Sequence, residues 1–224
     1  MFQYQWRIMG TASIEPLELV AAAYKAQLKE HGPSPNGVLW SALESQQSRF
    51  ELLSQVMGDD SGKSGISVND LGCGYGALFE FLDARAWLQD GCYYGYDICA
   101  DMLAAANSRI CDPRADFTQS MIATRRADYS FASGTFNLKG TVTDAEWAIY
   151  VKESLLWLWE QSAEGLAFNL LDGTCTTEPK EWLYYPDPAE FYDFCRQNLS
   201  SAIQRVDDPV RKDCTLLLQR ESST

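Results

Sequence analysis

The stretch Ser67-Val68-Asn69-Asp70-Leu71-Gly72-Cys73-Gly74-Tyr75-Gly76-Ala77-Leu78 decides the fold of this chain. A short apolar run that includes the acid Asp70 is typical of a buried strand, and three alternating glycines follow it. Glycine accepts positive φ and lets a ligand approach the backbone without a Cβ in the way. A helix that begins after such a turn directs free backbone N–H groups and a positive helix end toward one point. The stretch therefore predicts a strand, a tight turn and a helix that together bind a polar or anionic ligand.

Length, composition and net charge limit the fold class and the partners of the protein. The chain has 224 residues, of which 46% are hydrophobic, enough for one α/β domain with extra elements. Lys and Arg total 18 against 31 for Asp and Glu, a net charge of -13 that repels phosphate backbones and anionic lipid headgroups. We therefore expect neither nucleic acid nor a membrane as a partner. The first seven residues lack the apolar segment of an export signal, so we expect a cytoplasmic protein.

The cysteines and histidines indicate a protein without a metal site. Seven cysteines occur, an odd number with no Cys-x-x-Cys pair, which is typical of reduced thiols in a cytoplasm. A zinc site needs clustered ligands, and His31 is the only histidine. We expect no bound metal.

Outside the opening stretch, predicted helices alternate with predicted strands. Two helices, over 13–31 with Ser13 as N-cap and over about 39–57 with a capping box at Ser41, precede the polar linker 59–65. We expect this linker to divide one domain into an N-terminal helical cap, 1–62, and a core, 63–224. Within the core the expected helices are 77–89, 101–108, 143–159 and 187–198, and the expected strands are 67–71, 92–97, 114–119, 129–134, 165–172, 202–206 and 214–219.

The order of these elements predicts an α/β fold with a seven-stranded, mostly parallel sheet. Strands that alternate with helices favour parallel pairing with helices on both faces. The last two strands are joined too tightly for a crossover, so they form a terminal antiparallel hairpin. In such sheets ligands bind at the carboxyl ends of the strands, where the loops after Asp70, Asp97, Gly134 and Asp172 meet. The irregular segment 173–186 is a candidate cover for that site.

The segment Asp70-Leu71-Gly72-Cys73-Gly74-Tyr75-Gly76 resembles the first motif of the class I S-adenosylmethionine-dependent methyltransferases. In that family an acid and three glycines follow the first strand. The resemblance extends over about 66–219, because an acid that ends the second strand, a loop after the fourth strand and a closing hairpin occur in family order. It implies a Rossmann-like fold with S-adenosyl-L-methionine as the methyl donor. It also implies methyl transfer, for which we expect a small-molecule acceptor of unknown identity.

The resemblance assigns the glycine turn to one end of the cofactor. Gly72, Gly74 and Gly76, with Cys73 between them, would form the turn against its methionine and ribose parts. Asp70 would anchor this turn and the amino group, directly or through water. Cys73 needs only to be small at its position, so we do not expect a reactive thiol.

The resemblance also assigns the adenosine end. Asp97 would accept hydrogen bonds from the ribose hydroxyls, and Ile98 and Met102 would pack on the adenine. Ser120 and Met121 would touch the adenine edge, where many relatives carry an acid that this chain lacks.

We expect no constellation of catalytic groups, because methyl transfer from a sulfonium depends mainly on alignment and desolvation. Three residues are candidates for assistance: His31 as a general base, Asn137 as a positioning residue for the acceptor, and Tyr185 as part of a substrate lid with its neighbour Tyr184. Each has a structural alternative, namely a helix C-terminal histidine, loop capping and ordinary packing. The helix 143–159, with its three tryptophans, is predicted to be core and not a ligand platform.

Two other functions remain open at this point. Gly72, Gly74 and Ala77, with Asp97 some twenty residues on, also fit the looser dinucleotide fingerprint, so an NAD-dependent oxidoreductase is an alternative. The acid Asp70 before the first glycine and the closing hairpin count against it. A cofactor-binding but inactive partner subunit is the other alternative.

Overall fold

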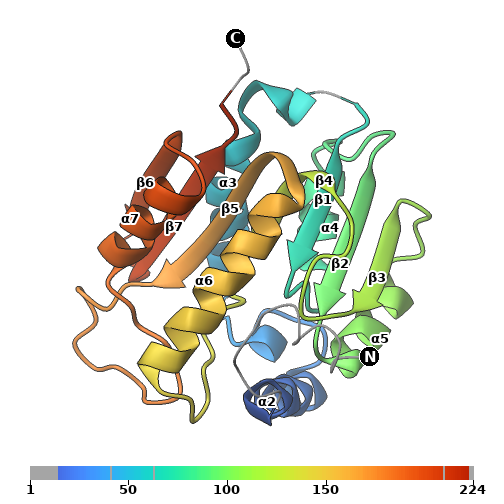
Figure 1. Ribbon diagram of the computed structural model, residues 1–224. Helices are drawn as coiled ribbons and strands as arrows, with labels where there is room; N and C mark the ends of the chain where they lie inside the picture. Colours follow the sequence, from blue (N-terminus) through green and yellow to red (C-terminus); the bar gives the residue numbers. More distant parts are fainter. Residues whose placement is uncertain (1–14, 41, 63, 209, 222–224) are drawn as a thin grey trace.

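The structure is a computed structural model that describes residues 15–40, 42–62, 64–208 and 210–221. A seven-stranded sheet forms its centre (Figure 1), in the order β3-β2-β1-β4-β5-β7-β6. The strands are β1 (Ser67–Leu71), β2 (Cys92–Asp97), β3 (Ala115–Gln119), β4 (Ala127–Ala132), β5 (Ser162–Leu171), β6 (Ile203–Asp208) and β7 (Asp213–Gln219). The first five pair in parallel, whereas β7 pairs antiparallel with both β5 and β6. The predicted sheet and its terminal hairpin are confirmed.

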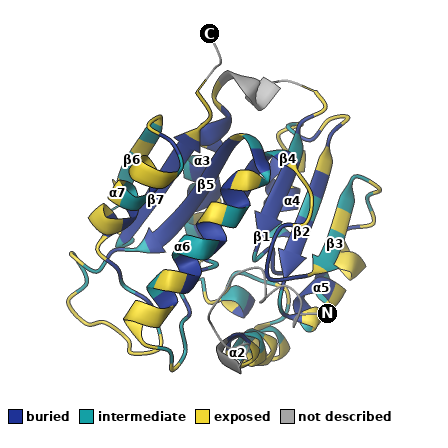
Figure 2. Ribbon diagram, in the orientation of Figure 1, coloured by how far each residue is buried: buried dark blue, intermediate teal, exposed yellow. Residues whose placement is uncertain are grey.

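Helices cover both faces of this sheet, and α2 (Glu15–His31) lies at its carboxyl edge (Figure 1). The other α-helices are α3 (Leu43–Ser54), α4 (Ala77–Asp83), α5 (Ala100–Arg109), α6 (Asp144–Glu160) and α7 (Pro188–Asn198). Phe50 of α3 and Phe79 of α4 belong to the apolar cluster on one face, while Leu155 of α6 and Phe191 of α7 belong to the cluster on the other. Figure 2 shows the central strands buried between these layers.

The N-terminal segment divides between a sheet face and the end of the sheet. Helix α3 packs on the sheet through Phe50 and Leu53, so it is part of a covering layer. Helix α2 and the short 3-10 helix η1 (Asn36–Val38) lie beyond the carboxyl ends of the central strands (Figure 1). Helix α3 starts later than the predicted 39, because Leu39 has a left-handed φ of 65° at the end of η1. The predicted caps Ser13 and Ser41 lie outside the described residues.

Helix α4 is shorter than predicted. It ends at Asp83 instead of 89, and the chain continues in turns in which Ala86 and Asp90 adopt φ values of 58° and 57°. The backbone N–H of Trp87 bonds to the carbonyl of Leu82 at 3.1 Å, which folds this segment back on the helix. Leu88 is buried by this return and not by a helical turn, so helical spacing of apolar residues misled the prediction.

The later helix starts agree with the sequence signals. Thr143 and Glu146 form the predicted capping box of α6, and the carboxylate of Asp187 accepts a 2.9 Å bond from the N–H of Ala189 before α7. Strand β4 begins two residues before the predicted 129 and β5 three before 165, because both strands start with small or polar residues that carry no apolar signal. Among the described residues, no helix combines the length and the apolar character needed to cross a bilayer.

Candidate functional site

A pocket opens where the sequence predicted a site, at the carboxyl ends of the parallel strands. Its empty space, with the open mouth included, is about 890 Å³. The loops after β1, β2, β3 and β4 line it together with side chains from α2, α3 and α6. The segment 173–186, a candidate cover in the sequence, contributes no lining residue.

The glycine turn brings backbone to the pocket wall. Gly72 has a φ of 75°, and a Cβ there would lie 2.6 Å from Oγ1 of Thr135. The N–H groups of Gly72 and Cys73 donate to the carbonyl of Tyr96 at 2.7 and 3.0 Å, which ties the turn to the end of β2. No residue with a side chain fits at Gly72 unless the loop that bears Thr135 moves.

The other residues of the turn divide between pocket and core. Cys73 and Gly74 line the pocket, and Gly74 has a φ of 54°. Gly76 does not line it: a Cβ there would lie 2.4 Å from the side chain of Ile110, so this glycine serves the packing of α4. Burial raises the pKa of the Cys73 thiol well above its usual value, which keeps the thiol protonated.

Asp70 is a buried carboxyl at the pocket wall. Its side chain accepts a hydrogen bond from the hydroxyl of Tyr93 on β2. Burial raises the pKa of Asp70 to about 7; the Tyr93 hydrogen bond opposes this shift, and the charge of Asp97 adds to it. Sequence reasoning missed Tyr93. The signal was the strand period, because Asp70 pairs with Gly95 and Tyr93 lies two residues from Gly95 on the same side of β2.

Asp97 connects the turn after β1 to the turn after β2. Its Oδ2 accepts a 2.8 Å bond from the N–H of Gly74, and its Oδ1 accepts a 2.8 Å bond from the N–H of Cys99. Burial raises the pKa of Asp97 to about 6, although these backbone bonds lower it. A carboxylate oxygen that accepts one bond retains a lone pair, so Asp97 can accept further hydrogen bonds from a ligand in the pocket.

Four more predicted site residues lie beside Asp97. Ile98, Met102, Ser120 and Met121 all line the pocket, and the two methionines are almost fully buried. The hydroxyl of Ser120 donates a 2.6 Å bond to the carbonyl of Ile122 and accepts a 3.1 Å bond from its N–H, so it shapes the loop after β3. We call the part of the pocket formed by Asp70, Gly72, Gly74 and Asp97 the glycine–acid end.

The three candidates for catalytic assistance do not line the pocket. His31 is exposed at the end of α2, with Nε2 3.8 Å from Glu30. The carbonyl of Asn137 accepts a 2.8 Å bond from the N–H of Tyr184, so Asn137 joins the loops after β4 and β5. Tyr185 is half-buried, and Tyr184, a predicted lid residue, is buried in the core.

Aromatic side chains form the rest of the pocket. Tyr24 of α2, Trp40, and Trp147 and Tyr150 of α6 line it; we call these four the aromatic wall. Trp147 and Tyr150 are also core residues, so the prediction of helix 143–159 as core is confirmed, and the sequence did not show that these two residues also line the pocket. Burial raises the pKa of Tyr150 to about 12 and that of Tyr24 further, so both phenols keep their protons near neutral pH.

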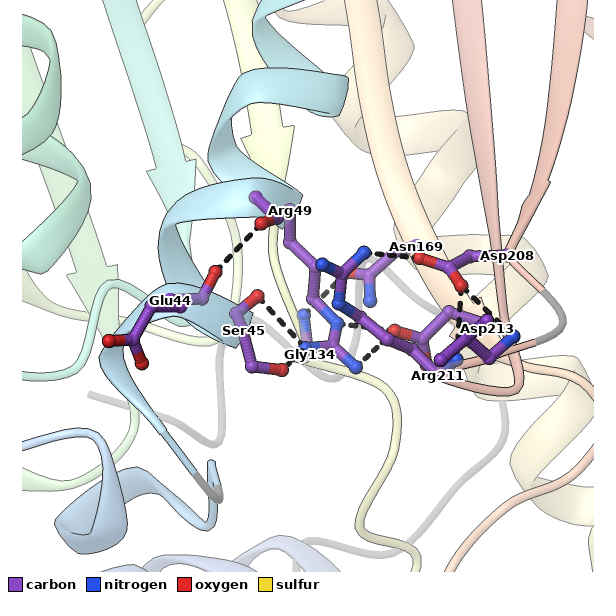
Figure 3. Close-up of polar contacts among 10 residues, drawn as sticks. Glu44, Ser45, Arg49, Gly134, Asn169, Asp208, Arg211 and Asp213 are labelled. Atoms are coloured by element: carbon purple, nitrogen blue, oxygen red, sulfur yellow. Dashed lines mark hydrogen bonds and ion pairs between the residues drawn. The ribbon is translucent and has the colours of Figure 1, made fainter.

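The indole of Trp40 packs against the buried guanidinium of Arg49. The guanidinium carbon of Arg49 lies 4.1 Å from the centre of the Trp40 ring, and Arg49 pairs with the buried Asp213 of β7 (Figure 3). Trp40 also abuts Gly134, where a Cβ would lie 2.4 Å from the ring. The N–H of Gly134 donates a 2.8 Å bond to Oδ1 of Asn169 on β5, which fixes this contact.

The part of the chain that the structure describes contains no candidate metal site. No group of three or more His, Cys, Asp or Glu residues there is arranged to hold a metal ion.

The chain resembles known methyltransferases in sequence and in fold, although no protein-family model matches it. A Mycobacterium tuberculosis protein that is named as a methyltransferase is 37% identical over 159 residues, which cover 70% of this chain and 95% of that protein.

The fold is similar to that of the Synechocystis magnesium protoporphyrin IX methyltransferase with bound S-adenosylmethionine (TM-score 0.57, 16% identity, 79% of each chain). It is also similar to human N-acetylserotonin methyltransferase in complex with S-adenosylmethionine (TM-score 0.61, 12% identity, 96% of this chain and 61% of that chain). Given the sequence relative and the fold together, this chain belongs to the class I S-adenosylmethionine-dependent methyltransferases.

Proposed function

We propose that this pocket binds S-adenosyl-L-methionine and that the protein transfers its methyl group to a small-molecule acceptor. The observation that carries the proposal is the glycine–acid end. Two buried carboxyls and a turn of positive-φ glycines meet there at the carboxyl ends of β1 and β2. A sulfonium cofactor with a free amino group and a ribose diol needs carboxylate acceptors and close backbone approach.

The residues present fit this cofactor. Asp97 has lone pairs for the ribose hydroxyls, and Asp70 would bind the amino group, directly or through water. Ile98 and Met102 supply apolar surface for the adenine, with Ser120 and Met121 at its edge. In this assignment Gly72, Cys73 and Gly74 approach the methionine part.

The acceptor would bind beside the aromatic wall, under residues of the N-terminal segment. Tyr24 of α2 and Trp40 contribute to this wall, which supports the division into a cap, 1–62, and a core, 63–224. Helix α3 belongs to the cap in sequence but packs on the sheet. The pocket is concave and mostly apolar, as is usual for small-molecule sites.

The protein's own contribution to catalysis is positioning and exclusion of water. When bound, the cofactor supplies a methyl group on a positively charged sulfur. The aromatic wall removes water from the acceptor side, and Asp70 and Asp97 fix the donor side. Tyr24 and Tyr150 retain their protons, so neither phenol acts as a base near neutral pH. His31, Asn137 and Tyr185 stay outside this mechanism.

Calorimetric titration of S-adenosylhomocysteine into the purified chain tests this proposal. The Asp97→Ala variant should bind about 10- to 100-fold more weakly, because hydrogen bonds to a charged group contribute about 1.5–3 kcal/mol. Asp193→Ala, which removes an exposed acid of α7, is the matched control and should bind like the wild type. Absence of S-adenosylhomocysteine binding at millimolar concentration, or tight binding of NAD(H) in its place, would overturn the proposal.

A further inference from the structure

Tyr93 of β2 is buried next to Asp70 but does not line the pocket. Its hydroxyl donates a hydrogen bond to Oδ2 of Asp70, and the two residues are 0% and 2% exposed. The other oxygen of Asp70, Oδ1, accepts no bond from the described residues and is not enclosed by them. Because Asp70 lines the pocket, Oδ1 is the oxygen left for a ligand. The carboxyl therefore has one oxygen fixed by the protein and one open to the pocket.

The packing around Tyr93 fixes the position of its hydroxyl. The Tyr93 ring makes edge-to-face contacts with Phe79 of α4 and Phe117 of β3, with ring centroids 5.4 and 5.8 Å apart. Gly95 is the residue of β2 that pairs with Asp70, and a Cβ there would lie 2.7 Å from the Phe117 ring. A larger residue at 95 would displace the ring that holds Tyr93. The hydroxyl is therefore held in place by apolar packing, independently of its bond to Asp70.

The groups around Asp70 decide its charge. The described titratable side chains on this face of the sheet and at the turn come from β2, the turn after β1, and β4: Tyr93, Asp97, Cys73 and Tyr129. Burial raises the pKa of Asp70 to about 7; the bond from Tyr93 opposes the rise, and the charge of Asp97 adds to it. Burial also raises the pKa of Tyr93 well above its usual value, so Tyr93 stays a hydrogen-bond donor.

Asp70 is thus near the midpoint of its titration at neutral pH, where one hydrogen bond changes its charge most. A hydrogen bond to a charged group corresponds to about one to two pKa units. Without the Tyr93 hydroxyl, the Asp70 carboxyl would be mostly protonated near pH 7. The amino group of S-adenosylmethionine is cationic at this pH, and it binds a carboxylate more tightly than a neutral carboxylic acid.

Building on the proposed function, we infer that Tyr93 is a positioning residue for methyl transfer: its hydroxyl holds the Asp70 carboxyl in its ionised form and leaves Oδ1 toward the amino group of S-adenosyl-L-methionine. Tyr93 touches neither the cofactor nor the acceptor. It acts through Asp70, so its removal changes the pH dependence of cofactor binding.

Calorimetric titration of S-adenosylhomocysteine between pH 6 and 9 tests this role. In Tyr93→Phe the midpoint of the pH dependence should rise by about one to two units. Binding should then be about 3- to 5-fold weaker than in the wild type at pH 7, and less than about 2-fold weaker at pH 9. Tyr94→Phe is the matched control, because it removes a hydroxyl from the next residue of β2, on the opposite face of the sheet, and it should reproduce the wild-type profile.

A second background separates positioning from a general effect on the fold. In Asp70→Asn, the further change Tyr93→Phe should alter the affinity less than about 2-fold at every pH, because the ionisable carboxyl through which Tyr93 acts is gone. A loss in Tyr93→Phe that is equal at all pH values, or that persists in the Asp70→Asn background, would overturn the inference.

Carbon-13 NMR titration of the Asp70 carboxyl in the wild type needs no variant to fold. Its midpoint should fall when S-adenosylhomocysteine saturates the chain, and an unchanged midpoint would overturn the inference. If S-adenosylhomocysteine binds and the Tyr93→Phe profile matches that of the wild type, this inference fails and the proposed function stands. If S-adenosylhomocysteine does not bind to the wild type, the proposed function fails and this inference fails with it.

Discussion

The two ends of the pocket are built in different ways. The glycine–acid end consists of backbone and two carboxyls from adjacent turns after β1 and β2, tied together by short hydrogen bonds. The aromatic wall consists of large rings from α2, the loop before α3 and the start of α6. The glycine–acid end depends on glycines, whose missing side chains allow close backbone contacts. The aromatic wall depends on large side chains that neighbouring residues hold in place. Variants should therefore damage the two ends through different physical effects.

The largest effect should come from the support of the aromatic wall. Arg49 and Asp213 are 7% and 3% exposed, so Arg49→Met leaves a buried carboxylate without its partner. We expect a loss of about 3–5 kcal/mol in the free energy of unfolding, measured by urea denaturation. The double variant Arg49→Met/Asp213→Leu should recover much of this loss, because an apolar pair needs no counter-charge.

A surface ion pair provides the control for Arg49. Arg125 and Asp116 are 51% and 47% exposed, so Arg125→Met should cost less than about 1 kcal/mol. Similar losses in Arg49→Met and Arg125→Met would show that the buried pair does not support the wall.

A somewhat smaller effect is expected at the glycine turn. Gly72→Ala places a Cβ 2.6 Å from Oγ1 of Thr135 and also strains a φ of 75°. The left-handed strain costs about 1–2 kcal/mol and the overpacking adds about 1–3 kcal/mol. Gly140→Ala is the matched control, because Gly140 has a φ of 62° but no atom within 4 Å of the added Cβ. Equal losses of unfolding free energy in the two variants would contradict the close approach of Thr135.

The smallest of the three effects should be a gain in stability. The pKa of Asp70 is about 7 in the folded chain against 3.8 ordinarily, so between pH 4 and 7 the unfolded chain ionises while the folded chain keeps its proton. The free energy of unfolding therefore falls as the pH rises through this window, and the cost stays constant above it. Asp70→Asn keeps an acceptor for Tyr93 and removes this cost, so at pH 8 it should stabilise the chain by about 1–3 kcal/mol.

The same variant should weaken cofactor binding, so stability and function change in opposite directions. We expect about 10-fold lower affinity for S-adenosylhomocysteine in Asp70→Asn at pH 8. A variant that is less stable than the wild type at pH 8 would show that burial does not raise the Asp70 pKa as described. Denaturation at pH 3, where residue 70 is mostly neutral in the wild type both folded and unfolded, should show little difference between the wild type and Asp70→Asn.

The sequence predicted one end of the pocket and missed the other for a physical reason. Two local signals predicted the glycine–acid end: the glycines that follow Asp70, and the acid that ends β2. The structure brings Asp70, Gly72, Gly74 and Asp97 together as these signals predict. Capping residues likewise located the starts of α6 and α7.

The aromatic wall has no local signal. Its members are separated by up to about half the chain, and Arg49 and Asp213, which support it, are 164 positions apart. Apolar periodicity shows that Trp147 is buried but not that it also faces a pocket. The candidates His31, Asn137 and Tyr185 were chosen by residue type, and side-chain chemistry alone does not indicate which loop reaches the site.

A crystal structure of the chain with bound S-adenosylhomocysteine tests the division of the pocket most directly. We predict that the ribose hydroxyls bond to Asp97, that the amino group lies at Asp70, and that the sulfur faces the aromatic wall near Ser133. A ligand that binds with its adenine against Trp40 and Trp147, or outside this pocket, would contradict the account.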